Sequence, residues 1–426
     1  MEKFINEKVV VYISKFTNTK VIEALKDGMM FSLPFLMIGS LFLLIANLPI
    51  KSLNTLVAEC GLADICSQVY SSTFSLMALF TVVGITYSYL KNDKISTAVN
   101  GALTGLAAFV LLTPSSKVLE NGEAVTGVIS KDWTAGQGMI CAILIGFLVG
   151  YIYSLCIRKD IRVKMPEGVP PGVADSFSSL LPTGIITIVC AIIYAVCHFV
   201  FKTTFAELIY SAIQIPLQGV TDSFAGVVIM TVMMSLLWWT GVRGGSICGG
   251  ILSPILQANM AANQKILDSG VALTVQNGGH IFTQQFWDNF LCMSGAVIGL
   301  VIYITFFAKS ESLRSLGKLS IVPNIFNINE PIIFGTPIVL NIYLLVPFVL
   351  VPLIIGISSY LLMYFGILPL FSGVMVPWTT PPIISGFLIG GWKVALWQLV
   401  MIIISFVVYF PFIKKIDTLS SKNENK

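Results

Sequence analysis

The chain has 426 residues, of which 56% are hydrophobic and only 11% are charged, and its mean hydropathy is +0.87. This composition excludes a soluble globular protein and predicts an all-α polytopic membrane protein. The formal net charge of +4 is modest and lies between the apolar runs. Such a distribution argues against nucleic acid as a partner and indicates charges that orient the chain in membrane lipid.

Residues 1–20 have the pattern of an amphipathic helix at the membrane surface. Apolar side chains recur there at helical spacing (Ile5, Val9, Tyr12, Ile13 and Phe16), and lysines take other positions (Lys3, Lys8, Lys15 and Lys20). A cleaved signal peptide would instead need a continuous apolar run and a small-residue cleavage site. We therefore expect an interfacial helix.

Five apolar runs of roughly spanning length come next, since a transmembrane helix needs about 20 mainly apolar residues. They lie at residues 21–48, 73–90, 96–112, 133–157 and 178–201. The connection after the fourth run is the richest in positive charge, with Arg158, Lys159, Arg162 and Lys164. Because positively charged connections stay on the cytoplasmic side, this loop and the N-terminus are predicted to be cytoplasmic.

Residues 202–219 read as a second amphipathic helix that lies flat on the outer surface. One helical face is expected to hold Phe205, Leu208, Ile209, Ala212 and Ile213, and Pro216 is expected to end the helix. An interfacial connector midway through the chain predicts two membrane domains, at residues 1–201 and 220–426.

The second half is less regular than the first. The glycine-rich residues 241–263, which include Arg243 and Pro254, fit a crossing, a re-entrant hairpin or a broken helix. Residues 376–391 form a second irregular element, rich in proline and glycine. Clean spans are predicted at residues 221–240, 286–308, 342–365 and 392–413, which bring the C-terminus back to the cytoplasm.

The most informative stretch is residues 319–341, where Asn327, Asn329 and Glu330 interrupt an apolar sequence that contains three prolines. Proline removes a backbone donor and biases the preceding residue toward an extended conformation, so a break between helical pieces is predicted at Glu330–Pro331. A carboxylate at membrane depth is costly unless it is used, which makes Glu330 the candidate centre of function. The alternative is a surface acid that pairs with Lys309, Arg314 or Lys318.

Irregular segments around Arg243 and Glu330 are typical of a substrate site near the middle of the membrane. Asn327, Asn329, Thr379 and Thr380 provide the donors and acceptors that a polyol needs. Tryptophans (Trp238, Trp239, Trp378 and Trp392) provide flat faces for a sugar ring, although each singly fits an interfacial belt. Arg243 and Glu330 could alternatively form a structural ion pair.

Metal and nucleotide chemistry are not expected. The eight cysteines are scattered without metal-ligand spacing and are interpreted mostly as small buried hydrophobes. The two histidines, His198 and His280, lie far apart and without an acidic cluster. No Walker-type phosphate loop is present, so the sequence predicts no metal, no cofactor and no ATP hydrolysis by this chain.

Four stretches together resemble the enzyme IIC permeases of the bacterial phosphoenolpyruvate-dependent sugar phosphotransferase system, in the lactose/cellobiose/diacetylchitobiose family. They are FNINEPIIFGTPIVLN at 326–341, MPEGVPPGVADSFSSLLP at 165–182, GVRGG at 241–245 and PWTTPPIISGFL at 377–388. The resemblance implies an inner-membrane homodimer with about ten transmembrane helices and two re-entrant hairpins. It also implies a dimerisation half at 1–201, a transport half at 220–426, and sugar binding by Glu330.

One position departs from the family pattern, because Arg243 stands where the glycine-rich turn of the family resembles G-I-H-G. Histidine can donate, accept or shuttle a proton, whereas arginine is a permanent cation with a fork of donors. Arg243 could bridge to Glu330, hold an anionic sugar or receive the phosphoryl charge.

The resulting expectation is a sugar permease that works with a phosphorylated IIB protein, and indirectly with IIA. The sugar hydroxyl would be presented to a phosphocysteine on IIB, with Glu330 orienting it and backbone N–H groups near Gly244 facing the phosphate. Phosphotransfer would therefore occur only together with IIB. The rival function is an ion-coupled secondary sugar transporter with Glu330 as the coupling site. A receptor without transport is disfavoured, because intramembrane polar residues would then be an unused cost.

Overall fold

A computed structural model describes residues 19–46, 57, 59–118, 123–166, 168–241, 244–292, 297–336, 338, 339 and 341–424. The chain is helical apart from one small hairpin of strands β1 (Ser116–Val118) and β2 (Ala124–Thr126), which the all-α prediction did not include. Most of the interfacial helix expected at residues 1–20 lies outside the described residues.

The first predicted span is divided into α3 (Lys20–Met30) and α4 (Leu33–Ala46), which are separated by a turn. Helix α3 lies directly against α7 (Met77–Asn92) because glycines line the contact. A Cβ on Gly28 would approach Ile85 Cα to 2.6 Å, and one on Gly84 would approach Gly28 O to 2.3 Å. Small residues are what allow membrane helices to pack this closely.

The remaining predicted spans of the first half correspond to described helices. These elements are α6 (Leu62–Thr73), η2 (Phe74–Leu76), α8 (Ala98–Leu112), α9 (Lys131–Thr134), η3 (Gly136–Gly138), α10 (Met139–Arg158), α11 (Pro171–Ser178), α12 (Leu180–Val196) and the π-helical η4 (Cys197–Phe201). Helix α6 was not predicted, and it runs through η2 into α7 as one apolar segment, Leu62–Asn92.

The connector consists of α13 (Phe205–Ile209), the π-helical turn η5 (Tyr210–Gln214) and α14 (Ile215–Thr221), and it meets α15 (Phe224–Trp239) at 74°. Pro216 does not end the helix, contrary to the prediction. It lies in the first turn of α14, where a missing N–H is tolerated. The residues predicted to share one helical face are divided, because Ile209 is buried whereas Ala212 and Ile213 are exposed, and Gln214 and Gln218 are buried as well.

The second half contains α16 (Gly244–Asp268), η6 (Val275–Asn277), α17 (Gln284–Phe286), η7 (Trp287–Leu291), α18 (Ile298–Phe306), α19 (Glu311–Ile325), α20 (Glu330–Gly335), α21 (Ile342–Tyr364) and α22 (Ile384–Glu424). Within the described residues, 244–263 form part of a single helix that includes Pro254. The segment predicted as a span at 286–308 contains the π-helical η7 and α18, and because residues 293–296 lie outside the described part, a continuous span there remains a prediction. Helix α22 is broken at Gly390 and Gly391.

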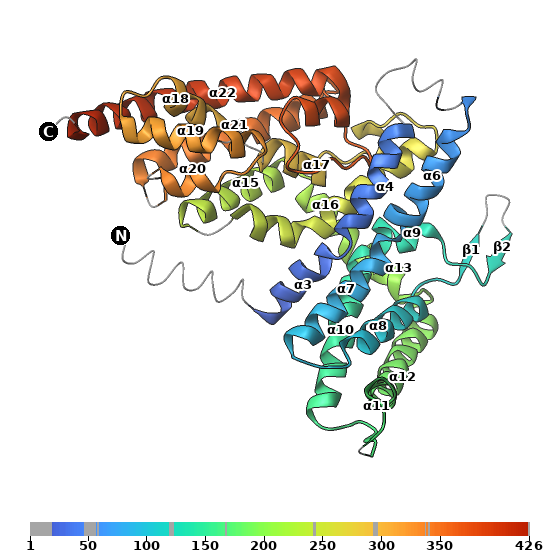
Figure 1. Ribbon diagram of the computed structural model, residues 1–426. Coiled ribbons are helices and arrows are strands. Elements are labelled where there is room, and N and C mark those ends of the chain that lie inside the picture. The colour runs from blue at the N-terminus through green and yellow to red at the C-terminus, as the bar shows by residue number, and fades with distance from the viewer. Residues whose placement is uncertain are drawn as a thin grey trace.

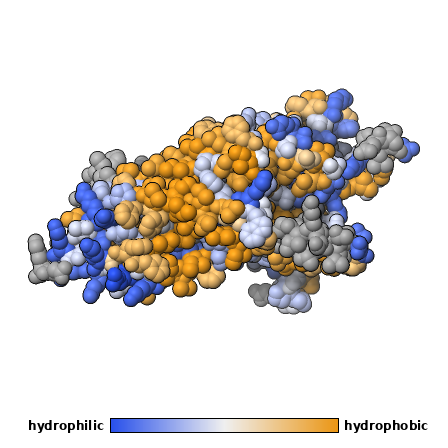
Figure 2. All heavy atoms as spheres, turned by 90° about the horizontal axis from the view of Figure 1, so that it is seen from above, coloured by the Kyte–Doolittle hydropathy of each residue, from blue (hydrophilic) through white to orange (hydrophobic). Residues whose placement is uncertain are grey.

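Five helices among the described residues are long and apolar enough to cross a membrane, or six if the bent connector and α15 form one span. They support a helical membrane protein, whereas the expected number of about ten spans remains a prediction. Figure 2 shows a broad apolar area across the middle of one face, with hydrophilic side chains gathered toward its ends. Such an apolar band is what a lipid-embedded surface requires.

Two hydrophobic clusters fill the interior. One consists mainly of side chains from α7, α8, α10 and α12, and the other joins the second half to α4 and to the start of α7. Helices α18 to α22 lie on the opposite side of α16 from α8 to α12 (Figure 1). Helix α16 therefore lies between the two helical groups.

A cluster of charges marks one end of α7. Asp93, whose side chain is 4% exposed, accepts hydrogen bonds from Lys20, Ser154 and Arg158. Lys20 begins α3, Asp93 follows the end of α7 and Arg158 ends α10, so the cluster holds three helices of the first half together. The other end of α7 continues into η2 and α6, so the Asp93 cluster and residues near Phe74 lie at opposite ends of the helix.

Candidate functional site

The glycine-rich turn between α15 and α16 packs on the connection between α20 and α21. The indole Nε1 of Trp239 donates a 3.0 Å hydrogen bond to the carbonyl of Asn341. Gly241 has a φ of +86°, and a Cβ there would lie 3.4 Å from Val339 Cγ1. The two irregular segments predicted at residues 241–263 and 319–341 are therefore in contact.

Gly244 begins α16 at a position where a side chain does not fit. A Cβ on Gly244 would lie 2.1 Å from the carbonyl oxygen of Met234, on the facing helix α15. The glycine is thus required for the close packing of α15 and α16. Arg243 itself lies outside the described residues, so its pairing with Glu330 and its contact with a substrate both remain predictions.

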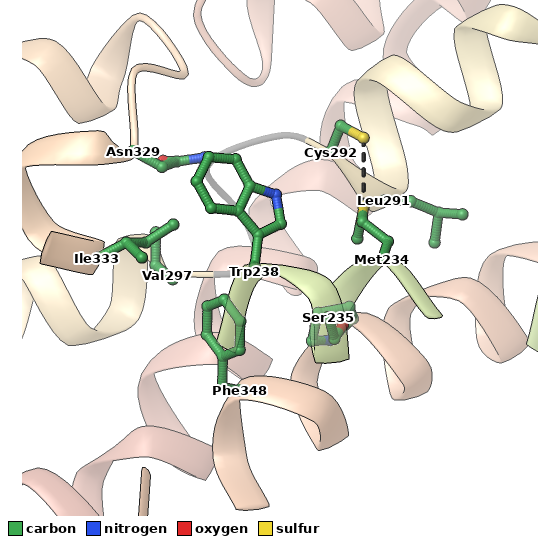
Figure 3. Close-up of a pocket in the computed structure, with 10 residues that line it drawn as sticks. Met234, Ser235, Trp238, Leu291, Cys292, Val297, Asn329, Ile333 and Phe348 are labelled. Carbon is green, nitrogen blue, oxygen red and sulfur yellow. Dashed lines mark hydrogen bonds between the residues drawn. The ribbon is translucent and has the colours of Figure 1, made fainter. Parts of the chain in front are cut away.

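A small cavity lies where these segments meet (Figure 3). The indole of Trp238 is at its centre, with Asn329 on one side and Phe348 on another, and Ser235 and Cys292 complete its polar wall. Its volume is about 30 Å³, enough for one or two water molecules. Ligand pockets for small molecules measure about 300 to 1,000 Å³, so sugar binding here requires the walls to separate.

Asn327 connects the two irregular segments that the sequence singled out. Its backbone has a φ of +62°, in the left-handed region, and its amide Nδ2 donates to the carbonyl oxygens of Trp378 and Thr380. The second of these hydrogen bonds measures 3.0 Å. Asparagine tolerates the left-handed conformation better than most residues, and its buried amide fastens the 377–381 backbone to the 326–329 break.

Asn329 and Glu330 lie at the end of this break, where α20 begins. The Asn329 Oδ1 atom accepts a 2.7 Å hydrogen bond from the buried Asn324 Nδ2, and Asn329 also lines the small cavity. Glu330 is the first residue of α20 and Pro331 lies in its first turn, so a break between helical pieces is present but lies at residues 326–329, just before the predicted Glu330–Pro331 bond. The side chain of Glu330 lies outside the described residues, and its role remains a prediction.

The other predicted side chains are dispersed. Trp378 is 55% exposed, and Thr379 and Thr380 are half-buried, so Trp378 and Thr380 contact Asn327 through their backbones. Trp238 lines the cavity, whereas Trp392 is exposed and packs on Phe387, with ring centroids 4.8 Å apart. Of the four tryptophans, the structure places Trp238 and Trp239 around the meeting of the segments.

Sequence reasoning missed two polar side chains that line this cavity and one carboxylate close to them in the chain. Ser235 and Cys292 lie within apolar runs, where nothing distinguishes them from helix-packing residues. Asp288 lies one turn before Cys292 and accepts hydrogen bonds from Gln284 Nε2 at 3.1 Å on both carboxylate oxygens. A carboxylate inside a predicted span was the available signal, because such a group is costly in lipid.

The fold and the site define a membrane transporter whose candidate substrate site is formed by broken helices. Comparison with known proteins gives the family: residues 26–352 match the family described as "Phosphotransferase system, EIIC", and the chain belongs to this family of sugar-transporting membrane components. The site residues Ser235, Trp238, Asn327 and Asn329 all lie within the matched range.

Two curated relatives and one solved structure show the same family over nearly the whole chain. The PTS system oligo-beta-mannoside-specific EIIC component of Bacillus subtilis (strain 168) is 34% identical, covering 99% of this chain and 95% of the relative. The PTS system cellobiose-specific EIIC component of Geobacillus stearothermophilus is 34% identical, covering 100% and 96%. The crystal structure of ChbC, the IIC component from the N,N'-diacetylchitobiose-specific phosphotransferase system, superposes with a TM-score of 0.93 at 34% identity, covering 99% of both chains.

Proposed function

We propose that this chain takes up a disaccharide with a β linkage and presents it for phosphorylation by a separate IIB protein. The main support is the contact among the irregular segments 241–263, 319–341 and 376–391. Near Trp238, Asn327 and Asn329 this contact brings polar groups and an aromatic face together, as a sugar site requires. The sugars in the names of the relatives, oligo-β-mannoside, cellobiose and N,N'-diacetylchitobiose, support a β-linked substrate. In the bacterial inner membrane, residues 1–201 would form the dimerisation half and residues 220–426 the transport half.

The proposed chemistry is transfer of a phosphoryl group from a phosphocysteine on IIB. The sugar hydroxyl oxygen attacks phosphorus, the S–P bond breaks, the thiolate leaves, and Glu330 accepts the hydroxyl proton. The product carries roughly two negative charges, which makes its return across the lipid prohibitive. Arg243 would stand beside this charge, either as a partner of Glu330 or as a ligand of an anionic group.

The proposed orientation places both termini and the 158–175 connection in the cytoplasm. The basic residues around Asp93 support it, since Lys20 and Arg158 gather there and Arg162 and Lys164 lie beyond them. We expect Lys159→Cys, in a chain stripped of native cysteines, to resist an impermeant thiol reagent in intact cells. The matched Val125→Cys, exposed on β2, should label readily. The reverse pattern would invert the orientation.

Reconstituted vesicles test the proposed function directly. With phosphorylated IIB on the side of the basic cluster, labelled cellobiose added on the opposite side should appear as sugar phosphate. An ion gradient without IIB should produce no accumulation. Accumulation of unmodified cellobiose on a proton or sodium gradient would instead identify the ion-coupled transporter and exclude group translocation.

A further inference from the structure

A second and much larger cavity lies between the two halves, away from the small cavity around Trp238. Its volume is about 540 Å³, within the range of about 300 to 1,000 Å³ typical of ligand pockets. We call it the interdomain cavity, and its walls include Tyr70, Lys131, Gln137, Gln214, Gln218 and Gln264. Elements α6, α9, η3 and the connector form one side, and α16 forms the other.

Along residues 211–220, the connector directs Gln214 and Gln218 toward this cavity and leaves its apolar side chains exposed. Gln214 and Gln218 are 1% and 6% exposed, whereas Ile213 and Val220 are 40% and 68% exposed. The π turn η5 contains Ile213 and Gln214, and such turns are frequent at functional sites. This later part differs from the first part of the connector, where Ala206 and Ile209 are buried in a hydrophobic cluster.

One acceptor in the wall lacks a partner among the described residues. Gln214 Nε2 donates a 2.8 Å hydrogen bond to the carbonyl of Gly136, which fixes the amide in place. Its Oε1 atom is buried and accepts no hydrogen bond within that part of the chain. A buried acceptor without a donor is unfavourable, so a small shift of the Gln214 side chain that let a ligand hydroxyl reach this oxygen would stabilise the wall.

Two lysines and two aspartates line the cavity. Lys131 donates to the Ser71 hydroxyl and Asp268 accepts from Gln264 Nε2, whereas the other two form an ion pair across the cavity. Lys265 on α16 lies 2.9 Å from Asp132 on α9, and Lys117 lies 3.8 Å from the same carboxylate. Burial alone would raise the pKa of the Asp132 carboxyl, but the hydrogen bond and charge of Lys265, together with Ser130 and Lys117, hold that pKa below its usual value. Because the charges offset one another, the cavity favours a neutral, hydroxyl-rich ligand over an ion.

An extended segment leads from this cavity to the candidate substrate site. The Gly373 N–H donates a 3.0 Å hydrogen bond to Gln264 Oε1 in the cavity wall. Five residues further along, the carbonyl of Trp378 accepts from Asn327. Five extended residues span at most about 18 Å, so the two places are neighbours along one piece of backbone.

The geometry points to the interdomain cavity as a second sugar-holding site, which binds a neutral oligosaccharide between the halves before it reaches the site at Asn327 and Asn329. The inference rests on the proposed function for its ligand class. The cavity lies near Phe74 and Ser75, at the end of α7 opposite the Asp93 cluster, and thus faces the outside in the proposed orientation. It is where an arriving sugar would first be held.

Filling the cavity tests this role. Ala262 lines it from α16, so Ala262→Phe places a ring inside, whereas Ala212→Phe adds the same ring on the exposed side of the connector. In vesicles with phosphorylated IIB inside, Ala262→Phe should raise the KM for outside cellobiose about tenfold, equivalent to ~1.4 kcal/mol, and leave kcat nearly unchanged. Ala212→Phe should match the unmodified protein. A wild-type KM for Ala262→Phe would overturn the inference.

A labelling assay tests occupancy of the cavity without requiring transport. Gln137→Cys, in a cysteine-stripped chain, places a thiol in the wall, and Val125→Cys on β2 places one outside it. Cellobiose should slow thiol modification of Gln137→Cys severalfold and leave Val125→Cys unchanged, with sorbitol as the osmotic control. If cellobiose protects Gln137→Cys but no IIB-dependent uptake occurs, the cavity binds sugar and the proposed function is rejected. Unprotected Gln137→Cys at concentrations that saturate uptake would reject the cavity alone, even if Ala262→Phe fails to fold.

Discussion

Glu330→Gln is expected to lower IIB-dependent phosphorylation of cellobiose by about 10²- to 10⁴-fold, the range by which a positioned general base accelerates proton transfer. Glutamine keeps the shape of the side chain but cannot accept the hydroxyl proton. Because Glu330 begins α20 beside Pro331, the substitution leaves the backbone of the break unchanged. The measurement is the initial rate of sugar phosphate formation at saturating cellobiose and saturating phosphorylated IIB.

Glu311→Gln provides the matched control for this prediction. Glu311 lies exposed in the first turn of α19, on the same stretch of chain but away from the break at residues 326–329. The control should retain the full rate and the thermal midpoint of the unmodified protein. A folded Glu330→Gln protein with an undiminished rate would remove Glu330 from the mechanism. A lowered rate in both variants would point to a general effect of charge removal.

Much of the helical framework could be predicted, because each membrane-spanning helix requires a run of about 20 mainly apolar residues that can be found in the sequence. Long apolar runs predicted α8, α10, α12 and α21 to within a few residues of their observed starts or ends. The prolines predicted a break in this stretch to within a few residues, although Glu330 is helical and Pro331 occupies the first turn of α20, where a missing donor is tolerated. These features depend only on residues that are close together in the chain, so a single sequence is enough to predict them.

The connector shows why other features could not be predicted. Helical spacing of 100° per residue placed Ile213 on the same face as Ile209, but the π turn Tyr210–Gln214 adds a residue and rotates the later part of the connector about its axis. Apolar side chains there also have an alternative to the protein interior, since lipid is as apolar as a leucine-rich core. The glutamines could therefore face inward without leaving the apolar residues in water.

The candidate site was only partly predictable, because its contacts join residues far apart in the chain. The sequence indicated that residues 319–341 and 376–391 are irregular and polar, but not that a single amide would connect them. Asn327 reaches the carbonyls of Trp378 and Thr380, 51 and 53 residues away. Neither carbonyl is visible in a side-chain pattern, so the expected roles for the Trp378 and Thr380 side chains remain predictions.

Asn327→Ala is expected to weaken cellobiose binding by about ten- to a hundredfold. Two effects add: two carbonyls lose their amide donor, and alanine is forced into the left-handed backbone region, which costs roughly 1–2 kcal/mol. Loss of the donor costs about 1–3 kcal/mol when the acceptors stay buried. The 377–381 backbone is then no longer held against the site, and sugar binding must supply that order.

Asn327→Gly separates the two effects, because glycine adopts the left-handed conformation without strain but has no amide. We expect the glycine variant to lose most of the affinity while recovering part of the thermal stability that the alanine variant loses. Asn277→Ala is the control, since Asn277 makes a 2.8 Å side-chain hydrogen bond to the carbonyl of Ala272 in an exposed loop. Cellobiose titration and thermal unfolding of the four proteins provide the comparison. Wild-type affinity in Asn327→Gly would show that the amide bridge does not position the site, and would leave backbone strain as the whole effect.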